Sequence, residues 1–254
     1  MKNLIVANLK MNLINSQERD RYLELITKEL KNKKFKNTEI VLCPPYVHLE
    51  AFQKSCKKGL RIGAQDMFSE SKGSYTGEIS PVMLKNYGCD FVILGHSDRR
   101  RYFSENNHEI NLKIIAALKN GLEPILCVGE NRGQRAETII KEQLKNCLKG
   151  INRSKMEKVT ICYEPVWAIS SNNPDHVPTT NEIMSAKLII KKFLVENFGL
   201  KVAERVRIIY GGSVDSINVN ETCINSGMSG ALVGKESLTP HRFVNVAKIM
   251  DNCN

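Results

Sequence analysis

The chain has 254 residues, which is enough for one large domain or two small ones, and 42% of them are hydrophobic and 25% charged. This composition is ordinary for a soluble globular protein. No apolar run approaches the ~18 residues that a membrane span needs, and the N-terminus lacks the apolar core and cleavage site of a signal peptide. We therefore expect a cytoplasmic protein with no membrane partner.

The formal net charge is +10, but the lysines and arginines are scattered along the chain. The densest basic runs are Lys31–Lys36 and Asp98–Phe103. The first run ends a helix-like segment, where cations suit the helix dipole, so we interpret it as a solvated helix end. The charge is also compatible with steering a small anionic substrate. We expect no nucleic-acid partner.

The eight cysteines form no C-x-x-C pair, so zinc-ribbon and thioredoxin-like interpretations lose their main support. Three of them, Cys43, Cys127 and Cys162, lie in strand-like runs. We expect buried free thiols in a reducing compartment, where disulfides are rare. The glycosylation sequons at Asn152 and Asn220 are then chance matches.

In chain order, strand-like and helix-like segments alternate. Most of the strand-like runs are continuously apolar, as strands covered on both faces should be. They are residues 3–9, 39–44, 60–65, 91–95, 122–129, 159–165, 206–212 and 230–234. The helix-like segments begin at Ser16, at Ser80 as the N-cap, near Glu105, and near residues 132, 179 and 238.

Eight β-runs, each followed by a helix-like run, match a (β/α)₈ TIM barrel in both number and length. We therefore predict an α/β fold, a single parallel closed sheet of eight strands, with residues 1–254 as one domain. The alternative is a doubly wound open sheet, which would normally show fewer strands and a glycine-rich first turn. That turn is absent after residues 3–9.

In such barrels the active site forms at the carboxyl ends of the strands. The predicted ends carry Asn8 and Lys10, Gly95 to Asp98, Glu164, Gly211 to Ser213, and Gly234. Alone, a strand-end histidine is more often a structural hydrogen-bonder, a glutamate before proline a turn residue, and a Gly-Gly-Ser sequence a tight turn. Their coincidence at one face of the barrel favours an active site.

The residue types at these ends suggest a reaction. Glycine lets the backbone approach a ligand, and a helix pattern near Val214 predicts a phosphate site at a helix N-terminus. An apolar setting beside Trp167 and Ile169 suits Glu164 as a general base. His96 can donate a hydrogen bond to a carbonyl or enediolate oxygen, and Lys10 can stabilise an oxyanion. With no metal-ligand spacing, we expect no metal and no cofactor. The set suggests proton abstraction alpha to a carbonyl on a phosphorylated sugar.

The sequence closely resembles the triosephosphate isomerase family along its whole length. The matching motifs are ANLKMN (7–12), GSYTGEIS (73–80), ILGHSDRR (93–100), CVGE (127–130), YEPVWAI (163–169), YGGSV (210–214) and GALVG (230–234). The resemblance implies an aldose–ketose isomerase of glycolysis and gluconeogenesis. It would interconvert dihydroxyacetone phosphate and D-glyceraldehyde 3-phosphate by proton transfer through an enediolate.

The resemblance also assigns roles to residues. Glu164 would be the base, His96 the electrophile, and Asn8 and Lys10 substrate-binding residues. The phosphate contacts would be Ser213, Gly234 and, in the following loop, Ser170. The family's lid corresponds to Pro165–Trp167 as its first hinge and Ser170–Asn173 as its tip. Gln65 and Thr76 would lie at a homodimer interface, where the loop of residues 69–80 supports Asn8 and Lys10 of the partner.

Four departures from the family pattern concern the surroundings of the site. The family usually has tryptophan at Leu9, glutamate at Asp98 and a second glycine at Lys235, and its lid reads AIGTGK where this chain has AISSNNPDHV. We keep Lys235 among the predicted substrate-binding residues. Two other functions stay open: a different sugar-phosphate isomerase, and an inactive barrel kept as a binding protein. One coupled assay of dihydroxyacetone phosphate conversion separates all three.

Overall fold

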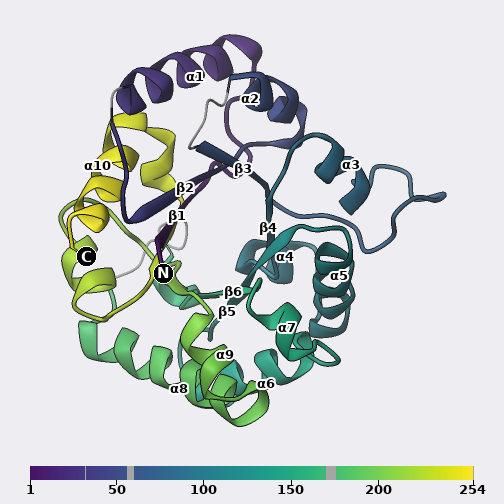
Figure 1. Ribbon diagram of the computed structural model, residues 1–254, viewed down its shortest axis with the longest axis vertical. Coiled ribbons are helices and arrows are strands. Elements are labelled where there is room, and N and C mark those ends of the chain that lie inside the picture. The colour runs from purple at the N-terminus through teal and green to yellow at the C-terminus, as the bar shows by residue number, and fades with distance from the viewer. Residues whose placement is uncertain (32, 56–59, 170–175, 254) are drawn as a thin grey trace.

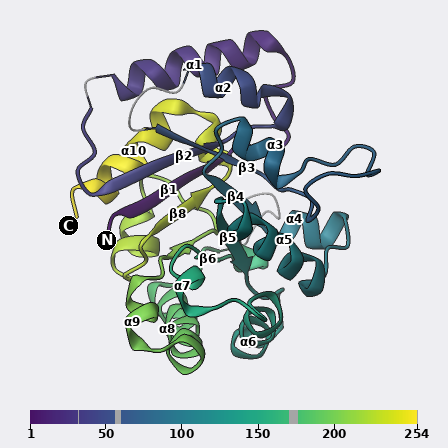
Figure 2. The ribbon, with the colours of Figure 1, turned by 45° about the vertical axis from the view of Figure 1, so that its right-hand side comes forward.

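Eight parallel strands pair in chain order and close into a barrel, with β8 hydrogen-bonded back to β1. The computed structural model describes residues 1–31, 33–55, 60–169 and 176–253. Helices surround the barrel on all sides (Figures 1 and 2). The predicted (β/α)₈ TIM barrel is therefore confirmed.

Each of the eight predicted strand runs overlaps a strand, and seven of the strands are shorter than their runs, whereas β2 has the predicted length but begins one residue earlier. The strands are β1 (Asn3–Asn8), β2 (Thr38–Cys43), β3 (Leu60–Ala64), β4 (Phe91–Leu94), β5 (Glu123–Val128), β6 (Thr160–Tyr163), β7 (Ile208–Tyr210) and β8 (Gly230–Val233). β6 ends directly before Glu164, because Pro165 has no N–H to continue the ladder. The predicted runs therefore differ from the observed strands mostly at their ends, where polar residues such as Glu164 leave the sheet.

Six helices follow the predicted helix-like segments. They are α1 (Ser16–Leu30), α3 (Pro81–Asn86), α5 (Asn107–Lys119), α6 (Ala136–Cys147), α8 (Thr180–Phe198) and α10 (Pro240–Asp251). The prediction that Ser16 caps α1 is wrong by one residue, because Asn15 accepts the Glu18 N–H. Ser80 caps α3 as predicted, with Pro81 at its first position.

Several short elements have no predicted counterpart. They are α2 (Leu49–Ser55), α4 (Ser97–Tyr102), α7 (Arg153–Met156), α9 (Leu200–Arg205), the 3₁₀ helices η1 (Tyr46–His48), η2 (Val166–Ala168) and η5 (Lys235–Leu238), and the π-helix η4 (Asn220–Ile224). The helix expected near Val214 does not begin there. Turn residues 216–218 come first, and the helical segment starts at Val219.

Two apolar layers explain why the strands are continuously apolar. One cluster fills the barrel interior and includes Leu4, Val6, Phe91 and Ile125. The alternate residues of the same strands, such as Ile5, pack outward against the helices. Successive side chains of a strand point to opposite faces, so each strand needs apolar residues on both.

An ion-pair network lies at the amino ends of the strands, opposite the predicted site. Arg61 and Arg207 both contact Glu39 and Glu123. Both guanidinium groups also lie over the ring of Phe91. Burial opposes the ionisation of Glu39, but its hydrogen bonds to the two arginines outweigh this and lower its pKa. The network caps the apolar interior of the barrel.

The barrel closes where β1 meets β8, at Leu4 and Gly230. A Cβ atom on Gly230 would lie 1.9 Å from the carbonyl oxygen of Leu4, and its φ is +138°. Only glycine tolerates both the close approach and this backbone conformation. Gly230 therefore makes the closing strand pair possible.

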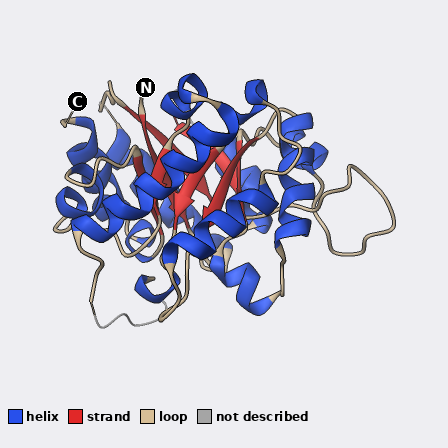
Figure 3. Cartoon of the chain, turned by 90° about the horizontal axis from the view of Figure 1, so that it is seen from below, coloured by secondary structure: helices blue, strands red, loops and turns tan. Residues whose placement is uncertain are grey.

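A long loop, residues 65–80, projects far from the barrel between β3 and α3 (Figure 3). In the described parts of the chain, no helix is long and apolar enough to cross a membrane. The thiols of Cys43, Cys127 and Cys162 are buried and free as expected, whereas Cys253 is exposed.

Candidate active site

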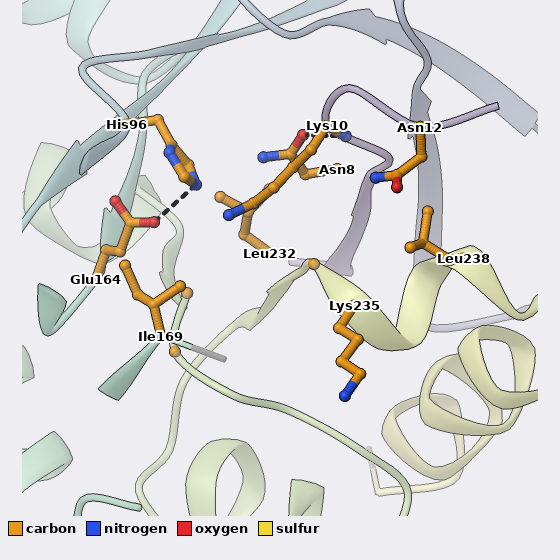
Figure 4. Close-up of a pocket in the computed structure, with 12 residues that line it drawn as sticks. Asn8, Lys10, Asn12, His96, Glu164, Ile169, Leu232, Lys235 and Leu238 are labelled. Carbon is orange, nitrogen blue, oxygen red and sulfur yellow. Dashed lines mark hydrogen bonds and ion pairs between the residues drawn. The ribbon is translucent and has the colours of Figure 1, made fainter. Parts of the chain in front are cut away.

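A cavity of about 190 Å³ opens at the carboxyl ends of the strands (Figure 4). It brings together six of the predicted site residues: Asn8, Lys10, His96, Glu164, Gly234 and Lys235. It is also lined by Asn12, Ile169, Gly211, Gly212, Leu232 and Leu238. Sequence reasoning did not name Asn12 as a site residue, although it ends the quoted motif ANLKMN. The predicted phosphate contact Ser170 lies outside the described residues.

The carboxylate of Glu164 is buried against the end of β4. It is 2% exposed, its Oε1 lies 2.8 Å from His96 Nε2, and its Oε2 accepts the Ser97 N–H at 2.9 Å. The backbone of Glu164 is also held in place, since its N–H donates to the Val128 carbonyl at the end of β5. Oε2 is therefore held by the main chain, whereas Oε1 has no hydrogen-bond partner among the described residues and faces His96 at the cavity.

The hydrogen bonds of His96 indicate its tautomer. The Asp98 N–H donates to His96 Nδ1 at 3.1 Å, so Nδ1 carries the lone pair. The ring proton of the neutral imidazole then sits on Nε2, the nitrogen that faces Glu164. A neutral ring in this orientation can donate a hydrogen bond into the cavity.

Lys10 is held in a left-handed conformation with φ +49°. Its N–H donates to Asn8 Oδ1, and its carbonyl accepts from Gln65 Nε2 at 2.8 Å. Its ammonium lies 2.9 Å from Asp98 Oδ2. A non-glycine residue with this φ is uncommon and often marks a functional site. Asp98 thus reaches Lys10 although its side chain is one methylene shorter than glutamate.

The segment after Glu164 is anchored away from the cavity. Trp167 Nε1 and the Tyr163 hydroxyl donate to Glu130 Oε1 at 2.9 and 3.2 Å. The Val166 N–H donates to the Glu130 carbonyl. Of the two apolar neighbours expected for Glu164, Ile169 lines the cavity, whereas Trp167 is not among the lining residues and turns to Glu130. The predicted tip of the lid lies outside the described residues.

The glycine turn after β7 has no room for side chains. A Cβ atom on Gly211 would lie 2.5 Å from Cys162 Sγ, and one on Gly212 would lie 2.1 Å from the Tyr210 hydroxyl. Ser213 follows, and its hydroxyl and N–H donate to the Ala168 carbonyl. The turn therefore brings bare backbone to the cavity, as predicted, but without a helix N-terminus at Val214.

Comparison with known proteins decides the family. The family model described as triosephosphate isomerase matches residues 3–250. The chain belongs to the triosephosphate isomerase family. It is 41% identical to the triosephosphate isomerase of Dictyoglomus thermophilum, over 97% of this chain and 99% of the relative. It is 42% identical to that of Dictyoglomus turgidum, with the same coverage, and 39% identical to that of Thermoanaerobacter sp., over 96% and 97%. The chain is an isomerase, and its function is triose phosphate isomerisation in glycolysis.

Two departures from the triosephosphate isomerase pattern can now be placed. Leu9 is completely buried in the outer core, so it fills space in place of an aromatic side chain. Lys235 begins the turn after β8, and its side chain points away from His96 and Glu164 (Figure 4). Neither departure displaces the residues that converge on the cavity.

Behind the site of this triosephosphate isomerase lies a group of four charged side chains, of which all but Arg99 are buried. Lys113 contacts both Asp66, at 2.9 Å, and Glu105, and Arg99 contacts the same two carboxylates. Burial raises the pKa of Asp66 to about 6, despite its two cationic neighbours. Asp66 directly follows Gln65, so the group supports the segment that holds the Lys10 backbone.

Replacing Lys113 with methionine should lower the free energy of unfolding by about 3 kcal/mol, because two buried carboxylates would then share only Arg99. The pKa of the Asp66 carboxyl is raised from its ordinary value of 3.8 to about 6 in the folded protein, so the protein loses stability as the pH rises through this range. Removing Lys113 would raise this pKa further and so increase the loss. The loss should therefore be larger at pH 8 than at pH 5. Urea unfolding at both pH values measures it, and the exposed Lys119→Met is the control. Equal losses at both pH values would contradict the role of Asp66.

Proposed function

We propose that Glu164 is the base that moves the proton between C1 and C2 of dihydroxyacetone phosphate and D-glyceraldehyde 3-phosphate, through an enediolate. The observation that carries this assignment is the convergence of Glu164, His96 and Lys10 on one cavity, with a separation of 2.8 Å between Glu164 Oε1 and His96 Nε2. A coupled assay of dihydroxyacetone phosphate conversion tests this assignment. The assignment predicts that the protein turns over this substrate and that turnover is lost when Glu164 is replaced.

The three side chains would divide the work. Glu164 would leave the Ser97 N–H and take the carbon-bound proton as a general base. His96 would donate its Nε2 proton in a hydrogen bond to the carbonyl oxygen, which gains negative charge as the enediolate forms. The Lys10 ammonium would stabilise the same charge. Asn8 would position the substrate, since it lines the cavity and holds the Lys10 N–H.

The phosphate of the substrate would lie at the glycine turns. Gly234 and Lys235 line the cavity after β8, and Ser213 follows the turn after β7. By family resemblance we propose Ser170 as a further phosphate contact from the lid. Glu164, His96 and Lys10 provide a base, a proton donor and a cation respectively. The proposed mechanism therefore needs no metal and no organic cofactor.

We propose that the chain acts as a homodimer through the loop of residues 69–80. Large apolar side chains are exposed on the segments that follow β1 and β2, on α4 and on the residue after α4. They are Met11, Ile14, Val47, Tyr102 and Phe103. Of the strands before these segments, β2 and β4 are the neighbours of β3 in the barrel. Exposed apolar groups gathered around a projecting loop favour a protein interface. Thr76 is exposed in that loop, where a partner would meet it, and Gln65 at its base holds the Lys10 backbone.

Changing Met11 to aspartate should weaken dimerisation by more than about a hundredfold, because an unpaired carboxylate would be buried between the subunits. Met11 is 93% exposed in the single chain. The matched control is Ile217→Asp, since Ile217 is 87% exposed but follows β7. Sedimentation velocity across a dilution series measures both variants. If Met11→Asp and its control had the same dimer dissociation constant, Met11 and the exposed residues beside it would not form the interface.

We further propose that the whole chain is one domain and works in the cytoplasm. The family model spans residues 3–250 in one match, and one barrel uses strands from both ends of the chain. The role in glycolysis and the buried free thiols support a reducing, cytoplasmic setting.

A further inference from the structure

A second and larger cavity lies at the other end of the barrel. It is a groove of about 1290 Å³ beside the C-terminal end of α1 and the amino ends of β2 and β3. Much of its wall comes from Lys31 and residues 33–36, which belong to the basic run that the sequence alone indicates to be a solvated helix end. The proposed isomerase mechanism uses none of these residues, so the groove needs a separate explanation.

The groove has an excess of free positive charge. Among its described residues Glu39 is the one acidic side chain, and it is paired with Arg61 and Arg207. Lys33 is paired with Glu29. The nearby carboxylate of Asp251 accepts main-chain N–H groups from Lys36 and Asn37.

Four ammonium groups therefore remain, those of Lys2, Lys31, Lys34 and Lys36. None of them forms an ion pair with a carboxylate in the described part of the chain. Crowding of like charges extends past the groove, since contact with Lys33 lowers the pKa of Lys248. Clustered lysines with no carboxylate partner attract multivalent anions, and phosphate groups above all.

The groove also has an apolar side. Leu30, Phe35, Ile40 and Leu60 line it together with the lysines. An inorganic phosphate chain would leave this surface in contact with water. A ligand that joins phosphates to a flat, weakly polar ring would use both the ammonium groups and the apolar surface. Because Phe35 is the one aromatic side chain among the described lining residues, stacking of successive bases of a nucleic acid is disfavoured.

We propose that this groove binds a nucleoside polyphosphate, with the phosphates on the lysines of residues 31–36 and the base on the apolar surface. The groove lies at the amino ends of the strands, and the isomerase site lies at their carboxyl ends. Binding there is independent of the proposed catalytic roles, and either assignment can fail without the other.

The test titrates the full-length protein with ATP, AMP and sodium tripolyphosphate at low salt by calorimetry. ATP should bind more tightly than the other two, and its Kd should rise with salt. The triple variant Lys31→Gln, Lys34→Gln, Lys36→Gln should raise the Kd for ATP about tenfold or more, with kcat and KM for dihydroxyacetone phosphate unchanged.

The matched control is Lys145→Gln, Lys149→Gln, Lys201→Gln, which removes the same charge from α6, the turn after it and α9, across the barrel. It should change the Kd for ATP less than about twofold. If both triple variants lost the same affinity for ATP, the proposed site would be overturned, because a nonspecific attraction of ATP to the basic protein would explain both losses. Tripolyphosphate that binds as tightly as ATP would remove the nucleoside from the proposal. ATP that competes with dihydroxyacetone phosphate would place the ligand in the isomerase site instead.

Discussion

Shortening Glu164 to aspartate should lower kcat about a hundredfold, with little change in the melting temperature. The carboxylate would retreat by about 1 Å from the position in which it now meets His96 Nε2 and the Ser97 N–H, at 2.8 and 2.9 Å. A displacement of this size at a reacting atom costs about 10²-fold in rate. Steady-state kinetics in both reaction directions measures the effect, with circular dichroism as the check on folding.

Two further variants sharpen this test. Glu164→Gln removes the base while keeping the length of the side chain, so its kcat should fall further, by about 10³–10⁴-fold. Glu236→Asp shortens a glutamate that pairs with Arg242 outside the cavity lining, and it should leave kcat unchanged. An aspartate variant at position 164 with turnover near that of the parent would refute the assignment of the base.

Replacing Lys10 with methionine should lower kcat/KM about a thousandfold. Methionine keeps an unbranched side chain of similar length but has no charge to stabilise the enediolate oxygen, and losing one such group typically costs 10²–10³ in rate. The variant also leaves Asp98 without its cation at 2.9 Å. Kinetics with dihydroxyacetone phosphate, together with the inhibition constant of inorganic phosphate, measures the loss.

A double-mutant cycle separates the charge of Lys10 from its pairing with Asp98. Asp98→Asn keeps the ammonium group and should cost about tenfold, through poorer positioning of Lys10. The double variant Lys10→Met, Asp98→Asn should be no slower than Lys10→Met alone, because Asp98 would act through Lys10. Additive losses would show that Asp98 has a separate role, and a Lys10→Met enzyme within threefold of the parent would exclude the cation from the mechanism.

The barrel could be predicted because its signals are local. Each strand is buried on both faces, so the sequence shows eight continuous apolar runs with helix-like segments between them. Glu164 could be placed at a strand end because Pro165 stops the ladder. Lys10, His96 and Glu164 then had to meet, since the carboxyl ends of parallel strands in a barrel share one face.

The parts that could not be predicted depend on partners far away in the sequence. The side chain of Trp167 turns toward Glu130, which follows a different strand. Lys113 looks like an ordinary helix residue until folding places it between Asp66 and Glu105. The exact start of α1 could not be predicted for a different, local reason, since Asn15 and Ser16 are both good capping residues and the geometry selects Asn15.

The closing strand pair has a consequence for synthesis of the chain. Leu4 in the first strand finds its partner in Gly230 of the last. At about 5–20 residues per second, a ribosome needs tens of seconds to deliver that partner. Throughout this time one edge of β1 has no neighbour, and such an edge can pair with other nascent chains. The β1–β8 junction is therefore where we expect a folding chaperone to be needed most, and a chain that stops before Gly230 would lose its active site together with its solubility.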